Sequence, residues 1–212
     1  MASPQDTTIE NLTGNWILQK VLWLLRKALA LGTIYISISQ YKTPDLSPDQ
    51  TLTHINFTQT TTGGLAGTAE NRVLDWKTAS HEDYIFGHVQ AQAEYVYGTT
   101  DADGKIRPDV EVKIDNANEE IRGWLRGEKE VDGSFSEGFL VERQSEDVER
   151  GDGLWVHTFE CNEGVGWMAE QVWGFEVLAG MRYFSRRVVV MDGGGRYICG
   201  RIVFDFLGRE SG

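Results

Sequence analysis

Three of the four histidines lie in strand-like segments, where an imidazole could reach a cavity. They are His54, His88 and His157, whereas His81 falls in a polar segment and is expected at the surface. A neutral imidazole can donate, accept or transfer a proton near pH 7. Gln171, in another alternating segment, carries an amide that could bind a carbonyl. These four side chains (His54, His88, His157 and Gln171) are the candidate catalytic groups, with a structural or surface position as the more common outcome for each histidine.

Aromatic and amide side chains share single faces of two alternating segments. One face of residues 167–175 carries Trp167, Gln171 and Trp173, and one face of residues 84–92 carries aromatic rings and amides. An apolar wall with a few amides is typical of a small-molecule pocket. The alternative is that these rings fill a closed core. The expected ligand-binding side chains are Tyr35, Asn56, Phe86, Gln90, Trp167 and Trp173.

Two pairs of charged residues also share faces, because their members lie two positions apart or four positions apart in expected strands. Glu70 and Arg72 form the first pair, and Arg182 and Arg186 form the second. A buried glutamate–arginine pair would perturb pKa values and could serve chemistry. A purely structural ion pair is the commoner outcome.

Familiar catalytic and metal-binding motifs are missing from the sequence. It has no Gly-x-Ser-x-Gly elbow, no Cys-x-x-Cys, no His-Glu-x-x-His and no phosphate-binding loop that opens a helix. Residues 101–104 resemble the start of a calcium loop, but the remaining ligands are missing, so a solvated turn is expected. Residues 192–195 are expected to form a turn. We therefore expect no metal, haem or nucleotide and no cofactor.

Composition narrows the partners. The chain has 212 residues and a formal net charge of −12, which disfavours nucleic acid and anionic lipid surfaces. Residues 1–10 lack the basic and apolar regions of a signal peptide, and the apolar run 21–31 is too short to span a bilayer. Cys161 and Cys199 are expected to be free thiols. The missing signal peptide and the free thiols predict a cytoplasmic protein. We also expect a monomer or homodimer that binds a hydrophobic small molecule in the pocket described above.

Alternation of apolar and polar residues predicts an all-β fold. Residues 21–31 are rich in leucine and alanine, which predicts one apolar helix, either across the mouth of a barrel or simply in the core. Evenly spaced short strands favour a single antiparallel barrel of about 8–10 strands over residues 11–208, after a tail at 1–10. Strands are expected at 14–20, 33–41, 51–60, 68–76, 84–97, 121–126, 138–143, 154–161, 167–177, 181–191 and 196–207, with a polar turn at 77–83.

Several blocks of sequence resemble lipocalin-like (calycin) β-barrels, and in particular a fungal family of such proteins. The blocks lie at residues 11–18, 61–76, 81–87 and 169–176. The resemblance implies that Trp16, two residues after Gly14, plugs the closed end of the barrel and that Arg201 stacks on its indole. One departure is that Lys20 leads directly into the apolar run, where family members have a longer acidic connection.

The resemblance also implies a function. Most members of the family are uncharacterised, and some are cofactor-free cyclases or pericyclases of secondary metabolism. An intracellular cyclase or isomerase acting on a hydrophobic metabolite is therefore expected. The alternative is a non-catalytic carrier that sequesters a similar molecule. Both require a cavity, and the residues alone do not separate them.

Overall fold

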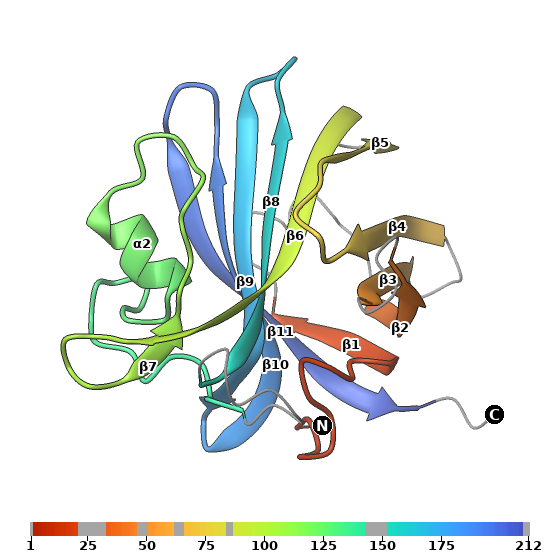
Figure 1. Cartoon of the computed structure of the whole chain (residues 1–212), viewed down its shortest axis with the longest axis horizontal. Helices are drawn as coiled ribbons and strands as arrows, with labels where there is room; N and C mark the ends of the chain where they lie inside the picture. Colours follow the sequence, from red (N-terminus) through yellow and green to blue (C-terminus); the bar gives the residue numbers. More distant parts are fainter. Residues whose placement is uncertain are drawn as a thin grey trace.

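The computed structural model describes residues 2–20, 33–45, 51–61, 66–83, 87–142 and 152–209. Within these ranges, eleven strands form one antiparallel sheet in the order β4-β3-β2-β1-β11-β10-β9-β8-β6-β5, and β7 pairs with β6. The sheet curls into a half-barrel, with the short helix α2 and its flanking loops on one side (Figure 1). The predicted all-β antiparallel fold is thus confirmed. The expected apolar helix at 21–31 lies outside the described residues.

Most strands lie within a few residues of their predicted positions, because glycine-containing turns separate clearly alternating runs. Their bounds are β1 Gly14–Lys20, β2 Ile34–Pro44, β3 Thr51–Thr61, β4 Ala66–Val73, β5 Ala79–Asp83, β6 Gly87–Thr100, β7 Ile106–Pro108, β8 Leu154–Asn162, β9 Trp167–Leu178, β10 Met181–Met191 and β11 Tyr197–Gly208. Two strands, β8 and β11, carry the cysteines, and β9 and β10 lie between them. Both thiols are free.

The expected strand at 121–126 is wrong, because this segment forms helix α2, Glu119–Leu125. The side chain of Asn118 caps its first turn by accepting a hydrogen bond from the backbone N–H of Ile121, at 2.9 Å. Ile121 and Trp124 lie three positions apart and are both buried, as expected for the inner face of a helix. An N-cap asparagine followed by two glutamates was the available signal for this helix.

Two smaller predictions are also corrected. The expected polar turn at 77–83 contains β5, which pairs with β6 at the edge of the sheet. The expected strand at 138–143 is reduced to one bridge, between Phe139 and Glu176. In both places tertiary pairing, which local alternation does not encode, decides the backbone structure.

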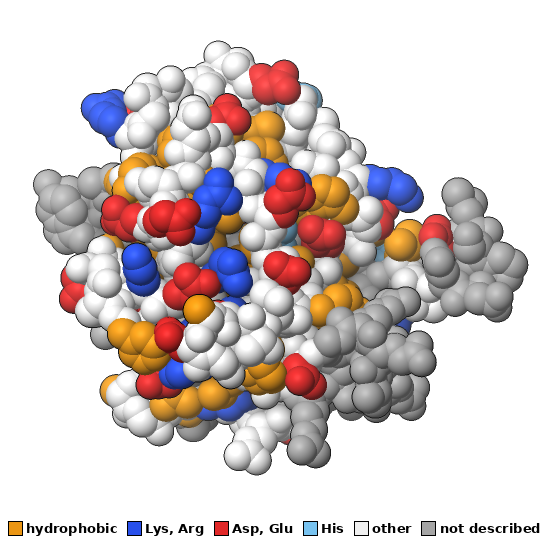
Figure 2. Space-filling model, turned by 60° about the vertical axis from the view of Figure 1, so that its left-hand side comes forward, with side chains coloured by type: hydrophobic (Ala, Val, Ile, Leu, Met, Phe, Trp, Pro, Cys, Tyr) orange, Lys and Arg blue, Asp and Glu red, His pale blue; other side chains and the backbone are white. Residues whose placement is uncertain are grey.

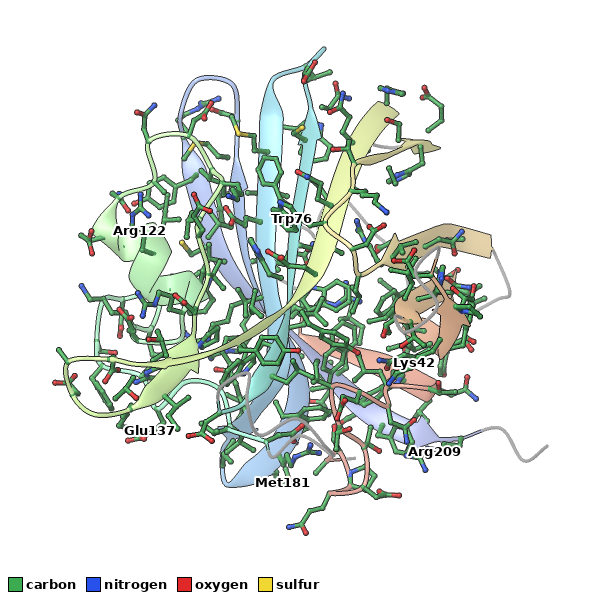
Figure 3. All side chains as sticks on the ribbon, viewed as in Figure 1. Lys42, Trp76, Arg122, Glu137, Met181 and Arg209 are labelled. Carbon is green, nitrogen blue, oxygen red and sulfur yellow. The ribbon has the colours of Figure 1, made fainter. Side chains whose placement is uncertain are left out.

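Two apolar cores lie on opposite faces of the sheet. The first contains residues from β1–β3 and from β8–β11, so it fills the inside of the curl, which we call the concave face. The second lies between the outer, convex face of β6 and β8–β11 and the layer formed by α2 and its loops. Figure 3 locates Arg122 and Glu137 in that outer layer, whereas Lys42 lies on the opposite side, among β2–β4.

The N-terminal segment closes one end of the concave core. Trp16 is fully buried, and its indole N–H donates to the Leu12 carbonyl at 3.0 Å. Arg182 donates to the backbone carbonyls of Pro4 and Thr7, at 2.7 Å each, and its guanidinium lies 3.6 Å from the centroid of the Phe175 ring. The buried position expected for Trp16 is confirmed.

The expected stacking of Arg201 on Trp16 is wrong. Trp16 of β1 pairs with Phe206 of β11. Arg201 lies five residues before Phe206 and therefore on the opposite face of β11. The rings that contact Trp16 belong to Phe184 and Phe206. Arg201 instead faces the convex layer, where its guanidinium lies 5.3 Å from the Trp124 ring.

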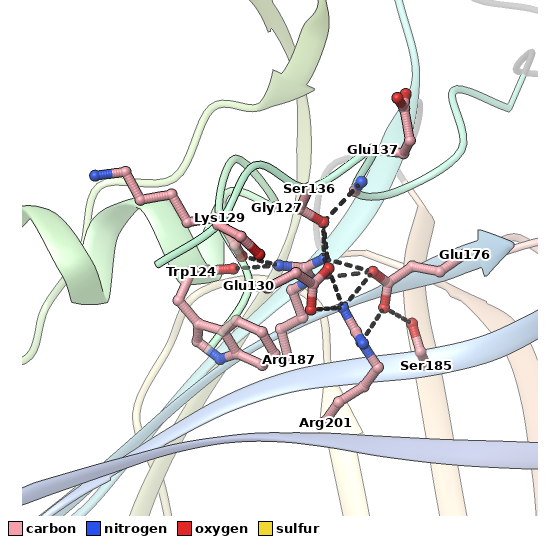
Figure 4. A network of polar contacts seen from close by, with 12 residues as sticks. Trp124, Gly127, Lys129, Glu130, Ser136, Glu137, Glu176, Ser185, Arg187 and Arg201 are labelled. Carbon is pink, nitrogen blue, oxygen red and sulfur yellow. Dashed lines mark hydrogen bonds and ion pairs between the residues drawn. The ribbon is translucent and has the colours of Figure 1, made fainter. Parts of the chain in front are cut away.

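A buried polar network joins the convex face to the outer layer (Figure 4). Glu176 accepts hydrogen bonds from Ser185 at 2.6 Å and from Arg187 at 2.7 Å, and it also pairs with Arg201 at 3.0 Å. Arg187 is fully buried and donates to the Lys129 carbonyl at 2.7 Å. Arg187 and Arg201 bond to Lys129 and Glu130 of the outer layer, so the network holds this layer against the sheet and we assign it a structural role. On the outside of this layer, acidic and basic side chains are interspersed (Figure 2).

α2 spans seven residues, and no helix in the described parts of the chain is long and apolar enough to cross a membrane.

Candidate functional site

The concave face of β6 and β8–β11 consists of rows of side chains that lie side by side across the paired strands. Nearest the closed end is an aromatic row, formed by Phe175, Phe184 and Phe204. The next is the arginine row, formed by Val156, Trp173, Arg186 and Ile202. Beyond it lie the polar row, Ala93, Thr158, Gln171, Val188 and Gly200, and the rim row, Ala91, Glu160, Ala169, Val190 and Ile198.

Arg186 forms the floor of this site. Its guanidinium carbon lies 3.9 Å from the centroid of the Trp173 ring and 4.2 Å from that of Phe57, which comes from β3 across the curl. A desolvated cation–π contact of this kind contributes about 2 kcal/mol. The aromatic rings therefore hold a buried cation in place above the aromatic row.

Strand β4 contributes two further charged groups from across the curl. Glu70 and Arg72 oppose Phe57 and Ile55 of β3, which points both side chains to the concave face. Glu70 lies 3.3 Å from Arg72 and 3.9 Å from Arg186, and Arg72 also pairs with Glu160 of the rim row. These four residues, Glu70, Arg72, Glu160 and Arg186, form what we call the interior charge cluster.

The interior charge cluster leaves several hydrogen-bond donors unused. Within the described part of the chain, Arg72 Nε and Nη1 and Arg186 Nε have no hydrogen-bond partner, and neither has the hydroxyl of Thr158. Arg72 is 4% exposed and Thr158 is fully buried. A buried polar group without a partner costs about 1–3 kcal/mol. A ligand that presented acceptor atoms here would remove that cost.

Arg186 and Glu70 are both charged at neutral pH. Burial raises the pKa of Glu70, but the charges of Arg72 and Arg186 outweigh burial and hold this pKa below its usual value. Burial lowers the pKa of Arg186 to about 10, partly offset by Glu70. Arg186 is therefore a cation that can donate hydrogen bonds across the physiological range.

A cavity adjoins the site at Arg72, and the rim row is exposed to solvent. Arg72 lines a cavity of about 130 Å³ between β4 and β6, together with Ala91 and Ala93. A water molecule occupies about 30 Å³ in the liquid, so this space holds more than one. The rim row is open, since Val190 and Ile198 are 41% and 43% exposed.

Two residues from the predicted site lie in this region. Gln171 and Trp173 occupy the polar and arginine rows, and the indole N–H of Trp173 donates to the Gln171 side chain at 3.2 Å. Trp167 lies on the same face of β9, at its first residue. The predicted sharing of one face by these three residues is confirmed. Phe86 lies outside the described residues.

The other predicted residues lie elsewhere. His54 stacks on Tyr41 on the outer side of β3 and hydrogen-bonds Thr43 at 2.8 Å, and Asn56 lies on that same side. Tyr35 is 41% exposed and lines an outer groove of about 420 Å³. His88 and Gln90 lie on the convex face of β6, whereas Val89 and Ala91 lie on its concave face. His88 pairs with Glu82, and both side chains are exposed. The expectation that all these residues line one cavity is therefore wrong.

His157 is buried on the convex face, between two carboxylates. Its Nε2 lies 2.7 Å from Glu170 and its Nδ1 lies 3.5 Å from Glu94. Burial lowers its pKa, but the hydrogen bonds to both glutamates outweigh this and raise the pKa above the usual value. Glu170 also accepts the backbone N–H groups of Lys113 and Ile114, at 2.9 Å, so His157 helps to fasten the outer loop. Trp76 stacks on the imidazole, with ring centroids 4.8 Å apart, and lies in Figure 3 over β6 and β8.

Sequence reasoning missed Thr158 and Glu160 and did not bring Glu70 and Arg72 together with Arg186 in one site. The shared face of Glu70 and Arg72 was visible from their spacing, as was that of Arg182 and Arg186. Their meeting was not, because β4 and β10 are far apart in the sheet and face each other only through its curl. No group of three metal-ligating side chains is found within the described residues.

Comparison with known proteins identifies one informative relative. The chain is 25% identical to a protein named probable pericyclase scpY from the fungus Mollisia scopiformis. The alignment has 223 positions and covers 99% of this chain and 96% of that protein. No family model matches the chain, and no solved structure does so either. The chain is therefore similar over its full length to a protein named as a pericyclase.

Proposed function

We propose that the concave face binds a hydrophobic small molecule and cyclises or isomerises it without a cofactor, in a lipocalin-like fold. The observation that carries this proposal is the set of unused donors on Arg72, Arg186 and Thr158, buried beside aromatic walls. The full-length similarity to a protein named as a pericyclase supports the same class of reaction.

The proposed chemistry uses positioning and hydrogen bonding. Trp173 and Phe57 restrict the substrate to a folded conformer, which brings its reacting carbons together. An N–H of Arg72 or Arg186 donates to a substrate carbonyl and stabilises the negative charge that develops on its oxygen. A cyclisation of this kind rearranges bonds within one molecule, so atoms and electrons balance without an oxidant, a reductant or a released proton.

A matched pair of threonine substitutions tests the proposal. Thr158→Val removes a buried hydroxyl that has no partner in the described structure, and Thr7→Val removes another such hydroxyl near the closed end. Loss of an unpaired buried hydroxyl is neutral or stabilising, so both variants should unfold at or above the wild-type temperature. Only Thr158→Val should slow product formation, by about 10-fold or more.

The substrate for this test comes from a metabolite comparison. Deleting the gene and profiling metabolites by mass spectrometry should reveal an uncyclised precursor, which purified protein should then convert in the extract. If the precursor accumulates but the protein only binds it, the protein is a carrier. If Thr158→Val formed product as fast as Thr7→Val, the concave face would not be the site of the reaction.

A further inference from the structure

The interior charge cluster carries a balanced charge, and this restricts the kind of ligand that it favours, provided that the concave face is the substrate site proposed above. Two guanidinium groups, of Arg72 and Arg186, face two carboxyl groups, of Glu70 and Glu160. The unused N–H groups can donate to any acceptor. An anionic acceptor, however, would add a third negative charge next to two carboxylates and would lose its hydration on entry.

An uncharged carbonyl satisfies the same donors without that penalty. It accepts a hydrogen bond from Arg72, Arg186 or Thr158 and leaves the existing ion pairs intact. The cluster is partly open to water, since Glu70 is 25% and Glu160 16% exposed, so both carboxylates retain some hydration while the ligand approaches.

The rows beyond Arg186 have two unlike halves. On β8 and β9 the polar and rim rows contain Thr158, Gln171 and Glu160. On β10 and β11 they contain Val188, Val190 and Ile198, which form a continuous apolar strip that leads from Arg186 to the open rim. Ligand burial on this strip would cover the exposed surface of Val190 and Ile198.

We propose that the substrate is an uncharged molecule in which a carbonyl is joined to a long apolar arm. The carbonyl faces the unused donors of Arg72, Arg186 and Thr158. The arm lies over the strip formed by Val188, Val190 and Ile198. Ala169, which separates Glu160 from Val190 in the rim row, sets the width available between the two halves. A larger side chain at this position would narrow the path from the rim to the arginines.

Two probes of equal carbon number test the charge preference: decyl methyl ketone and dodecanoate. Both are titrated into the full chain at about pH 8, where the free carboxylate is ionised. Calorimetry gives the affinities, and methyl NMR of labelled valine and isoleucine reports contact with Val188, Val190 and Ile198. We expect the ketone to bind at least about 10-fold more tightly than the carboxylate.

Glu160→Gln and Glu163→Gln form a matched pair of variants. Both remove one negative charge from the chain, but Glu163 lies exposed in the turn after β8, away from the cluster. Glu160→Gln should improve dodecanoate binding about 10-fold and leave ketone binding nearly unchanged, because it makes the cluster cationic. Glu163→Gln should change neither affinity. Ala169→Leu should lower the affinity for the ketone.

The outcomes separate this inference from the proposed function. If dodecanoate bound at the strip as tightly as the ketone, with no effect of Glu160→Gln, the inference that the substrate is uncharged would be contradicted. That result would leave the concave face as the binding site. If neither probe shifted the methyl signals, the concave site itself would be overturned, and the substrate class with it.

Discussion

The guanidinium of Arg186 lies 3.9 Å above the indole of Trp173, inside the curl of the sheet. Pairing of β9 with β10 places the two residues side by side, so the contact follows from the strand register itself. Glu70, from the far side of the curl, provides the counter-charge at 3.9 Å. A buried cation is thus fixed by two elements that the chain brings together only on folding.

Replacing Arg186 with methionine should abolish most of the proposed catalysis. Methionine keeps apolar volume against Trp173 and Phe57 but has no N–H to donate. Turnover should fall about 10- to 1,000-fold, the usual cost of losing a donor to a developing oxyanion. Product formation on the precursor measures this, with thermal unfolding as the check on folding. Unchanged turnover in folded protein would assign Arg186 a structural role only.

Trp16→Ala should destabilise the protein by about 3–5 kcal/mol, the range for removing a large buried aromatic side chain. The residue is fully buried and contacts Phe184 and Phe206 at the closed end. Urea unfolding followed by circular dichroism gives the difference. Val165→Ala, at a side chain that is 73% exposed, serves as the control and should change the stability by less than about 0.5 kcal/mol. A loss below about 1 kcal/mol for Trp16→Ala would contradict the assigned packing.

His157→Gln should destabilise the protein more at low pH than at high pH. The folded-state pKa is raised, so the protonated imidazole stabilises the fold. This contribution is complete below the unfolded pKa of about 6.5 and is lost as the pH rises through the folded pKa. Free energies of unfolding measured at about pH 6 and at about pH 9 should therefore differ between wild type and variant mainly at the lower pH.

His88→Gln provides the comparison for that experiment. His88 pairs with Glu82, but both side chains are mostly exposed, so its loss should matter little at either pH. If the loss of unfolding free energy caused by His157→Gln stayed constant or grew as the pH rose, the predicted stabilising role of the imidazolium would be contradicted.

Glu176→Leu should cost about 3–5 kcal/mol, because it removes the nearer and more buried of the two carboxylates that pair with the buried guanidinium of Arg187. The same substitution at exposed Glu163 should be nearly neutral. Chemical denaturation compares the two variants. Near-wild-type stability of Glu176→Leu would mean that the network in Figure 4 does not hold the outer layer on the sheet.

Much of the fold could be predicted because a strand's side chains alternate with a strict period of two. Residues 51–60 were predicted as a strand, and the observed β3, Thr51–Thr61, buries alternate residues in its first half. Helix α2 was missed because its seven residues are too few for the helical period to stand out, and its stability comes from packing Trp124 against the sheet. Local alternation likewise did not reveal β5, whose existence depends on pairing with β6.

The sequence by itself determined which residues share a face: Gln171 with Trp173, Glu70 with Arg72, and Arg182 with Arg186. Only the tertiary structure decided which distant pairs meet, and it corrected the predicted inward face of β3. His54 and Asn56 alternate as well as Ile55 and Phe57 do, yet the apolar pair lies inside, because burying it gains more free energy than burying the polar pair. Arg201 does not contact Trp16, whereas Arg186 lies 3.9 Å from Glu70. Both outcomes follow from strand register and the curl of the sheet, which arise from contacts between distant segments and are not encoded in local patterns.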